Sequence, residues 1–473
     1  MTDLDLAYLP AGTMARTVAA GQLSPVELVD NALARIDEVN EQINAFCFVW
    51  DDEARAAAKE AADAVANGAE LGPLHGVPIA LKDTTPTAGH RTTLGSYAFE
   101  NWVPEHDGAV ARKLQEAGAI VVGKTTSPEF AHALTTESPL WGVTRNPWNL
   151  ERTPGGSSGG SGAAVASGCV PLAEGSDMGG SVRIPSAWCG IVGLKPGLGR
   201  IPMDVLPGLF DNISHHGPLA RCVDDARLFL EATQGPDEAD VLSLPTPLNL
   251  SSPMETDLRG VRVALSIDLG CWEVEPSVEA AVRNAAEACE NAGAIVSEVN
   301  PGFTGEEERE WYKLWSVFMA TYYGDLVEEF GDKMTPAVRE LISKGQAMDA
   351  VTYKRVEFMR TRMWWKMRTI LANNHVFLCP TMATTPVPAS SAELTLKAGM
   401  IDGRYHSPDM TAIWNMISPC PVLTVPCGLD ADGLPVGAQL VGQRWRSDLL
   451  LRIGAGLEAA LPPIGHPPLP KGV

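Results

Sequence analysis

A run of small residues, TPGGSSGGSGAAVASG, occupies Thr153–Gly168 and constrains the fold of this chain more than any other segment. Glycine has no Cβ, so a run of this kind adopts turns that other residues resist. Three structures are compatible with it: a flexible linker, a phosphate-binding loop, or a loop that holds catalytic groups. The flanking segments are needed to decide between them.

The flanks favour a packed loop over a linker. An NPWN motif precedes the run, and GAAVASGCVPLA predicts a small-residue helix that leads into a buried strand. A phosphate loop of the G-x-x-x-x-G-K-[ST] type needs a lysine, which the run lacks. An anion site at a helix N-terminus, built without lysine, stays open as an alternative.

A second Gly-Gly-Ser lies downstream, at Gly179, Gly180 and Ser181 within EGSDMGGSVRIPS. Two glycines before a serine let consecutive backbone N–H groups point to one place without a Cβ in the way. An oxyanion hole needs such preorganised donors where negative charge develops. The pattern therefore favours the catalytic interpretation, with Ser181 as a candidate nucleophile that requires a base.

The candidate base is a lysine, because no histidine is in a setting that singles it out. We expect His75, His132, His215 and His216 to be structural or surface residues, the last two in a loop flanked by glycine and proline. Lys82 ends the apolar strand VPIALK, where burial would lower the pKa of its amine and make a neutral base accessible. Ser–Lys pairs are an established alternative to Ser–His. Position alone favours an ordinary exposed lysine at a strand end.

Helical and strand patterns alternate along the chain, which predicts an α/β fold with a central mixed sheet covered by helices on both faces. Ser24, Pro25 and Glu27 form a capping box and mark the start of a helix. We expect further helices at 52–66 and 448–461, a helix followed by a strand in 107–126, a largely helical segment at about 306–373, and strands within 76–84, 375–381, 421–429 and 434–443.

Composition narrows the classes of function. The 473 residues carry a net charge of -22, which disfavours binding to nucleic acids or to anionic membranes. No apolar run approaches the roughly 18 residues of a membrane span, and the N-terminus lacks a signal-peptide pattern. The nine scattered cysteines, without a C-x-x-C pair, predict buried reduced thiols. We therefore expect a cytoplasmic protein without a metal site.

Taken together, several segments resemble the amidase signature family and occur in the order expected for it. They are GVPIALKD (76–83), GAIVVGKTTSPEF (118–130), WGVTRNPWN (141–149), PGGSSGGSGAAVASG (154–168), GSDMGGSVRIPSAWCGIVGLKP (175–196), PCPVLTVPCG (419–428) and LPVGAQLVG (434–442). The resemblance implies one amidase domain over 1–473, with N-terminal helices in 1–70, a signature core in 71–235, a helical substrate-funnel region at about 300–375 and a C-terminal sheet and helix in 376–473.

Members of this family use a Ser–cisSer–Lys triad. By the matching motifs, Lys82 is the base, Ser157 the linking serine after a cis peptide bond, and Ser181 the nucleophile. Ser176 stands where many members have threonine. The resemblance also assigns an oxyanion hole to the backbone N–H groups of Met178, Gly179, Gly180 and Ser181, and supporting positions to Gly156, Ser158, Asp177 and Arg183.

The reaction implied is the transfer of an acyl group from an amide to water, with no metal or organic cofactor. We expect aryl or other bulky amides as substrates, with carbamates and esters as variants. Alternatives are a dedicated carbamate hydrolase (urethanase), the A subunit of a tRNA-dependent amidotransferase, and a catalytically silent binding subunit. The expected partner is a small amide or carbamate, not nucleic acid or membrane, and the protein is expected to be a monomer or homodimer.

The substrate pocket is harder to place from the sequence. By resemblance it includes Ala131, His132, Leu134 and Trp141. The aromatic residues of the middle region are expected to be mostly helix core, with some of them lining a substrate funnel: Trp311, Trp315, Trp364 and Trp365.

Overall fold

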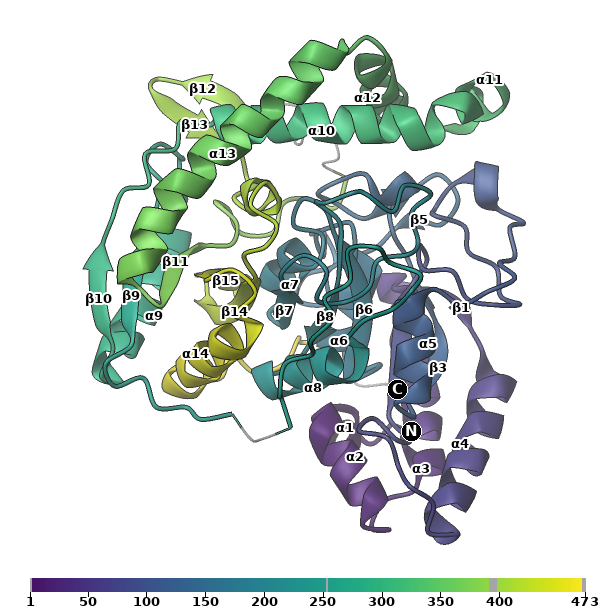
Figure 1. Ribbon diagram of the computed structural model, residues 1–473. Helices are drawn as coiled ribbons and strands as arrows, with labels where there is room; N and C mark the ends of the chain where they lie inside the picture. Colours follow the sequence, from purple (N-terminus) through teal and green to yellow (C-terminus); the bar gives the residue numbers. More distant parts are fainter. Residues whose placement is uncertain (1, 252–253, 391–397, 470–473) are drawn as a thin grey trace.

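An eleven-stranded mixed sheet runs through the computed structural model, which describes residues 2–251, 254–390 and 398–469 (Figure 1). The strand order is β1-β3-β2-β6-β8-β7-β14-β15-β11-β9-β10. In that order the strands are Phe46–Val49, Ile120–Thr125, Pro78–Lys82, Leu172–Asp177, His215–Ala220, Val192–Lys195, Val422–Leu429, Pro435–Gly442, Val376–Pro380, Arg262–Leu265 and Ile295–Glu298. The predicted α/β class and mixed sheet are confirmed.

The pairing of β2 with β6 places the site. β2 runs parallel to both β3 and β6, with Ile79 opposite Leu172 and Ala80 opposite Ala173. Parallel neighbours end at the same edge of a sheet, so the carboxyl ends of β2 and β6 meet there. The other parallel pairs are β9 with β10 and β9 with β11, and the remaining pairs of the sheet are antiparallel.

Helices cover both faces of the sheet, as predicted. Successive side chains of a strand point to opposite faces, and Ile79 and Leu81 belong to one buried hydrophobic cluster whereas Ala80 belongs to another. The first cluster includes residues of α5 (Ala109–Glu116), α8 (Val223–Thr233), α9 (Pro276–Asn291) and α14 (Ser447–Ala460). The second includes residues of α3 (Pro25–Ile43), α4 (Asp51–Ala66) and α6 (Gly159–Ala166).

The predicted helix starts and ends agree closely with the structure. The capping box is formed: Ser24 accepts a hydrogen bond from the Val26 N–H, and Glu27 accepts one from the Ser24 N–H at 2.9 Å. The remaining helices and short elements are α1 Leu4–Ala7, α2 Ala11–Ala19, α7 Arg183–Cys189, the 3-10 helices Tyr97–Phe99, Glu129–Ala131 and Ala412–Asn415, and the strand pairs β4–β5 (Glu137–Ser138, Gly142–Val143) and β12–β13 (Gly399–Ile401, Arg404–His406).

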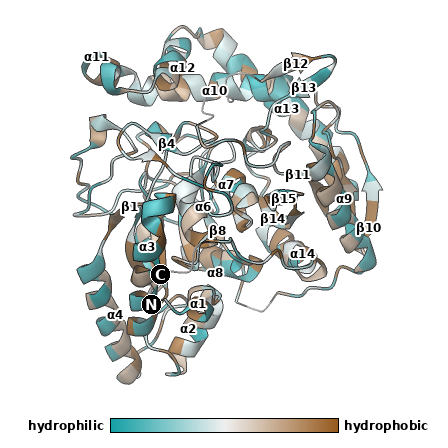
Figure 2. Cartoon of the chain, turned by 180° about the vertical axis from the view of Figure 1, so that it is seen from behind, coloured by the Kyte–Doolittle hydropathy of each residue, from teal (hydrophilic) through white to brown (hydrophobic). Residues whose placement is uncertain are grey.

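The middle segment forms a helical layer that lies along the top of Figure 1 and continues down its left side. It contains α10 (Glu306–Tyr323), α11 (Val327–Phe330), α12 (Pro336–Gln346) and α13 (Ala350–Asn373), joined by the short 3-10 helices Gly324–Leu326 and Gly331–Lys333. Hydrophilic and hydrophobic residues alternate along these helices, as expected where one face packs on the protein (Figure 2). No helix among the described residues combines the length and apolarity that crossing a membrane requires.

Candidate active site

Lys82 is fully buried at the end of β2. Its Nζ donates hydrogen bonds to Ser157 Oγ at 2.7 Å and to Ser176 Oγ at 3.0 Å. Burial lowers the pKa of the Lys82 amine to about 7, and the negative charges of Glu174 and Asp177 oppose this decrease. The expectation of an exposed lysine, drawn from position alone, was wrong because β2 lies inside the sheet between β3 and β6.

The small-residue run is packed, so the linker alternative is excluded: the residues of Thr153–Gly168 are all buried. The peptide bond between Gly156 and Ser157 is cis. A Cβ at Gly156 would lie 2.5 Å from the carbonyl oxygen of Ala133 and 2.6 Å from that of Thr135, so only glycine fits there. The backbone of Ala133–Thr135 therefore packs directly on the run at Gly156.

The start of α6 is not an open anion site. The Gly159 N–H donates to Thr136 Oγ1 and the Gly160 N–H donates to the Thr126 carbonyl, each at 3.2 Å. Ser158, just before the helix, donates its N–H to the Ser181 carbonyl, also at 3.2 Å. These donors are occupied within the protein, and the last bond joins the two Gly/Ser segments directly.

The loop Met178–Ser181 connects β6 to α7 and departs from the predicted oxyanion hole at one position. The Gly180 N–H donates to Asp177 Oδ1 at 2.8 Å, so it is occupied. The N–H groups of Met178, Gly179 and Ser181 have no hydrogen-bond acceptor within the described part of the chain. Gly180 has φ of +117°, and a Cβ there would lie 1.8 Å from Thr411 Oγ1. Glycine at 180 is thus required by conformation and by space.

Asp177 and Arg183 anchor this loop, as the resemblance implied. Arg183 donates to both carboxylate oxygens of Asp177 at 2.9 Å, and neither side chain is exposed. Asn415 donates to Asp177 Oδ1 at 3.0 Å and accepts from Arg183 at 2.7 Å. Burial alone would raise the pKa of Asp177, but the Arg183 charge and these hydrogen bonds hold it well below its ordinary value.

The C-terminal part of the chain completes the anchor. Arg183 also donates to the Thr411 carbonyl at 2.9 Å and to Gln439 Oε1 at 3.3 Å. The Thr411 hydroxyl bonds the Gly179 carbonyl at 2.7 Å and Asp409 Oδ1 at 2.5 Å. The backbone of the glycine loop is therefore fixed by residues more than 200 positions later in the sequence.

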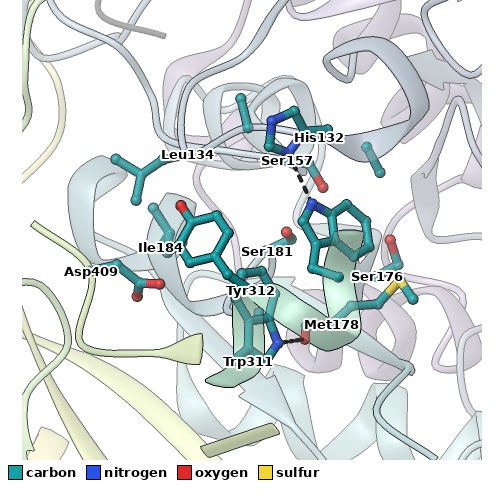
Figure 3. A pocket seen from close by; sticks show the side chains of 14 residues that line it. His132, Leu134, Ser157, Ser176, Met178, Ser181, Ile184, Trp311, Tyr312 and Asp409 are labelled. Carbon is teal, nitrogen blue, oxygen red and sulfur yellow. Dashed lines mark hydrogen bonds between the residues drawn. The ribbon is translucent and has the colours of Figure 1, made fainter. Parts of the chain in front are cut away.

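A pocket opens at this loop (Figure 3). Trp311 and Trp315 of α10 stack with their ring centres 5.9 Å apart. The Trp311 indole donates to the Met178 carbonyl, and the Trp315 indole to His132 Nδ1, each at 2.9 Å. Burial lowers the pKa of His132 to about 4, which makes it a neutral acceptor. The lining residues are Ala131, His132, Ala133, Leu134, Ser157, Ser176, Met178, Gly179, Ser181, Ile184, Trp311, Tyr312, Trp315 and Asp409.

Three of the four predicted pocket residues line this pocket, and Trp141 does not. Trp141 belongs to the turn between β4 and β5, and its indole donates to Thr93 Oγ1 at 2.9 Å while its ring packs against Phe48. Asp409 and Tyr312 also line the pocket, although no sequence motif points to them. Trp311 and Trp315 of α10 line it as two of the four expected funnel aromatics. Trp364 and Trp365 of α13 do not line the pocket.

The proposed triad is brought together only in part. Ser157, Ser176 and Ser181 line the same pocket. Of the two serines in the predicted triad, Ser181 is partly exposed and Ser157 is buried. Among the described residues, a hydrogen bond joins Lys82 to Ser157, but none joins the Ser181 hydroxyl to Ser157. His75, His132, His215 and His216 make no hydrogen bond to Ser181 there either.

His215 and His216 are structural, but they do not lie in a loop. Both are buried in β8, opposite Asp177 and Ser176 of β6. A ring nitrogen of His215 lies 3.2 Å from the Asp177 carbonyl, and His216 Nδ1 lies 2.8 Å from Glu174 Oε1. The glycine and proline that flank them suggested a loop, and pairing inside the sheet overrides that local preference.

Comparison with known proteins agrees with this geometry. The sequence pattern of the family described as Amidase matches residues 27–451. The chain is 37% identical over 471 residues to an acylamidase from Rhodococcus erythropolis, covering 98% of this chain and 97% of that protein. It is 35% identical over 458 residues to the A subunit of the glutamyl-tRNA(Gln) amidotransferase from Roseiflexus sp. (strain RS-1), covering 92% of each.

A solved structure has the same fold. The crystal structure of a bacterial aryl acylamidase of the amidase signature family aligns with a TM-score of 0.90 at 28% identity, and the alignment covers 96% of this chain and 97% of that one. The similarity extends over the sheet, the glycine loops and the helical layer together, because the alignment spans nearly the whole of both chains.

Proposed function

This chain belongs to the amidase family and is an amide hydrolase, and we propose that it cleaves aryl and other bulky amides through Ser181, Ser157 and Lys82. The observation that carries the proposal is the buried Lys82 amine, 2.7 Å from Ser157 Oγ. With a pKa of about 7, a substantial fraction of this amine is neutral at physiological pH and able to accept a proton.

In the proposed reaction, Ser181 Oγ attacks the amide carbonyl carbon. Its proton passes to Ser157 Oγ as the Ser157 proton passes to the neutral Lys82 amine, because a hydroxyl donates and accepts at once. Returning the proton along the same path to the amide nitrogen releases the amine and leaves an acyl group on Ser181. Water then repeats the attack and releases the acid. The missing Ser181–Ser157 bond is expected to form with substrate, since catalytic hydrogen bonds often tighten on binding.

The negative charge on the carbonyl oxygen needs donors during both attacks. We assign them to the backbone N–H groups of Met178, Gly179 and Ser181, which have no acceptor in the described part of the chain. Donors fixed in advance stabilise an oxyanion more than mobile water does. The Gly180 N–H serves instead to hold the loop on Asp177.

The aromatic wall supports the substrate class. His132, Trp311, Tyr312 and Trp315 surround the space next to Ser181, and stacked aromatic side chains favour a flat ring. The similar acylamidase and aryl acylamidase act, by their names, on acyl amides. Carbamates present the same carbonyl to the same nucleophile, so a urethanase is the first variant of this proposal. A role in a tRNA-dependent amidotransferase, as its A subunit, is the second, because of the 35% identity to such a protein.

The test is a hydrolysis panel of 4-nitroanilides, aryl carbamates, primary amides and glutamine, together with labelling by a fluorophosphonate that reacts with activated serines. We expect anilide hydrolysis and labelling by the wild type, and neither by Ser181→Ala. Ser167→Ala, a matched change in the same run, should keep both, since its hydroxyl bonds only within and just after α6. Activity confined to carbamates or to glutamine would select the corresponding variant, and a folded wild type that neither labels nor hydrolyses would refute the proposal.

A further inference from the structure

Glu174 is a fully buried carboxylate on β6 for which the proposed triad has no use. Its Oε2 accepts hydrogen bonds from the backbone N–H of Lys82 at 3.0 Å and from the Thr85 hydroxyl at 2.9 Å. Its Oε1 lies 2.8 Å from Nδ1 of His216, which is also fully buried. A buried carboxylate is costly unless it is paired, yet among the described residues its only ion-pair contact is this histidine.

The position of Glu174 relative to the base suggests why the charge is there. The charge of Asp177 also opposes the effect of burial on Lys82, but Asp177 is paired with Arg183, a permanent cation. Glu174 has no such cation, and it is the strongest of the charges that oppose the effect of burial on Lys82. The ionisable groups on the segments around Lys82 are Asp83, Lys124 on β3, Glu174 and Asp177 on β6, Arg183 on α7, and His215 and His216 on β8.

Lys124 is a second buried lysine near Glu174, and it donates to the carbonyl oxygen of Thr85 at 2.7 Å. Burial lowers the pKa of Lys124 to about 8, and the charges of Asp83 and Glu174 both oppose this decrease. Burial alone would raise the pKa of Glu174, but the hydrogen bond with His216 and the bond from the Lys82 N–H hold it below its ordinary value. Glu174 is therefore ionised beside Lys82.

We propose that Glu174 is a positioning residue for the base: it fixes the Lys82 backbone, and its negative charge keeps the buried amine basic enough to accept the Ser181 proton through Ser157. His216 holds the carboxylate in place. The inference rests on the proposed function, since it assigns Lys82 the role of base. Without the charge, burial acts on Lys82 unopposed by Glu174, and the amine becomes a weaker base that is neutral at lower pH.

Glu174→Gln isolates the charge from the geometry. The amide oxygen can still accept from the Lys82 N–H and from Thr85. The amide nitrogen can donate to His216 Nδ1, because a neutral histidine presents either nitrogen as the acceptor. Thr85→Val is the matched control, since it removes a hydrogen bond to the same carboxylate oxygen and leaves the charge in place.

The measurement is the pH dependence, from pH 5 to 9, of kcat/KM on a 4-nitroanilide and of the rate at which a fluorophosphonate labels Ser181. For Glu174→Gln we expect the acidic limb of both profiles to move by about one pH unit toward acid, as removal of a nearby buried charge requires. The acidic limb of Glu174→Asp should lie between those of Glu174→Gln and wild type, because the shorter side chain places its carboxylate farther from Lys82. For Thr85→Val the acidic limb of both profiles should stay at the wild-type pH.

A Glu174→Gln enzyme that is active with an unmoved limb overturns the role of Glu174 and leaves the proposed function standing. If circular dichroism shows that Glu174→Gln does not fold, Glu174→Asp decides, and an unmoved limb in that variant overturns the inference in the same way. A folded wild type that is not labelled at Ser181 overturns the proposed function and this inference with it.

Discussion

Replacing Asp177 by asparagine should destabilise the protein strongly, although the side chain keeps its shape. Oδ1 of Asp177 accepts from the Gly180 N–H at 2.8 Å, from Arg183 at 2.9 Å and from Asn415 at 3.0 Å. Oδ2 accepts from Arg183 at 2.9 Å and from the Val182 N–H at 3.3 Å. Donors thus surround both oxygens, and an asparagine NH₂ group would face donors in either orientation.

The magnitude follows from burial. Asp177 and Arg183 are completely excluded from solvent, so the substitution leaves the guanidinium with an unpaired charge. Removing one partner of a buried ion pair costs about 3–5 kcal/mol. Each donor left without an acceptor adds to this cost. We therefore expect a loss of at least about 3 kcal/mol in the free energy of unfolding.

The assay is urea unfolding followed by tryptophan fluorescence and far-ultraviolet circular dichroism, extrapolated linearly to water. The control is Asp257→Asn, the same change in an Asp–Arg pair that is joined at 2.7 Å but exposed, and it should leave the urea midpoint unchanged. If Asp177→Asn lowers the free energy of unfolding by less than about 1 kcal/mol, and the slope of that free energy against urea concentration is unchanged, the reasoning that this ion pair anchors the glycine loop is refuted.

Three further predictions concern the pocket and the thiols. With the Lys82 pKa at about 7, kcat/KM should fall about tenfold per pH unit below pH 7 because protonation removes the base; a flat profile from pH 5 to 8 would exclude Lys82. Gly179→Ala places a Cβ 2.3 Å from the Trp311 ring and should lower kcat/KM by at least about tenfold, whereas Trp141→Phe, remote from the pocket, should leave it unchanged in the same anilide assay. All nine cysteines are free and most are buried, so a thiol reagent should titrate nine thiols in denaturant and few in the native protein.

The helix starts and the Gly-Gly-Ser turns could be predicted from the sequence because each depends on contiguous residues, whereas the triad of Lys82, Ser157 and Ser181 came from the family resemblance and stays a prediction. A capping box lies within four positions, and the two Gly-Gly-Ser segments carry their own conformational requirement. The burial of Lys82 could not be read in this way, since it depends on the strands placed on either side of β2. The hydrogen bond from the Gly180 N–H to the Asp177 carboxylate could not be predicted either, because it depends on how the Asp177 side chain is oriented in the folded protein.

The pocket wall was the least predictable part. Asp409 reaches the glycine loop from a segment far away in the sequence, and nothing in its local pattern points to Ser181. Trp311 also reaches the loop from afar, and it was expected only as one of four tryptophans of which some line a funnel. Trp141 shows the converse: it is the first residue of a motif of the family, but the β4–β5 turn directs it to Phe48 and Thr93. Packing between distant segments determines which residues line the pocket, so a local motif cannot predict them.

The anchoring of the glycine loop by the C-terminal part of the chain has a consequence for synthesis of the chain on the ribosome. Arg183 and Gln439 are 256 residues apart. At about 5–20 residues per second the ribosome needs roughly 13–50 s to synthesise the chain between them. Throughout this interval the nascent chain has Lys82 and Ser181 but lacks Gln439, the last of the residues that hold Arg183, which anchors the glycine loop. The emerging enzyme should stay inactive until Gln439 has left the exit tunnel, and a stalled chain that ends before Asp409 should not react with a serine-directed label.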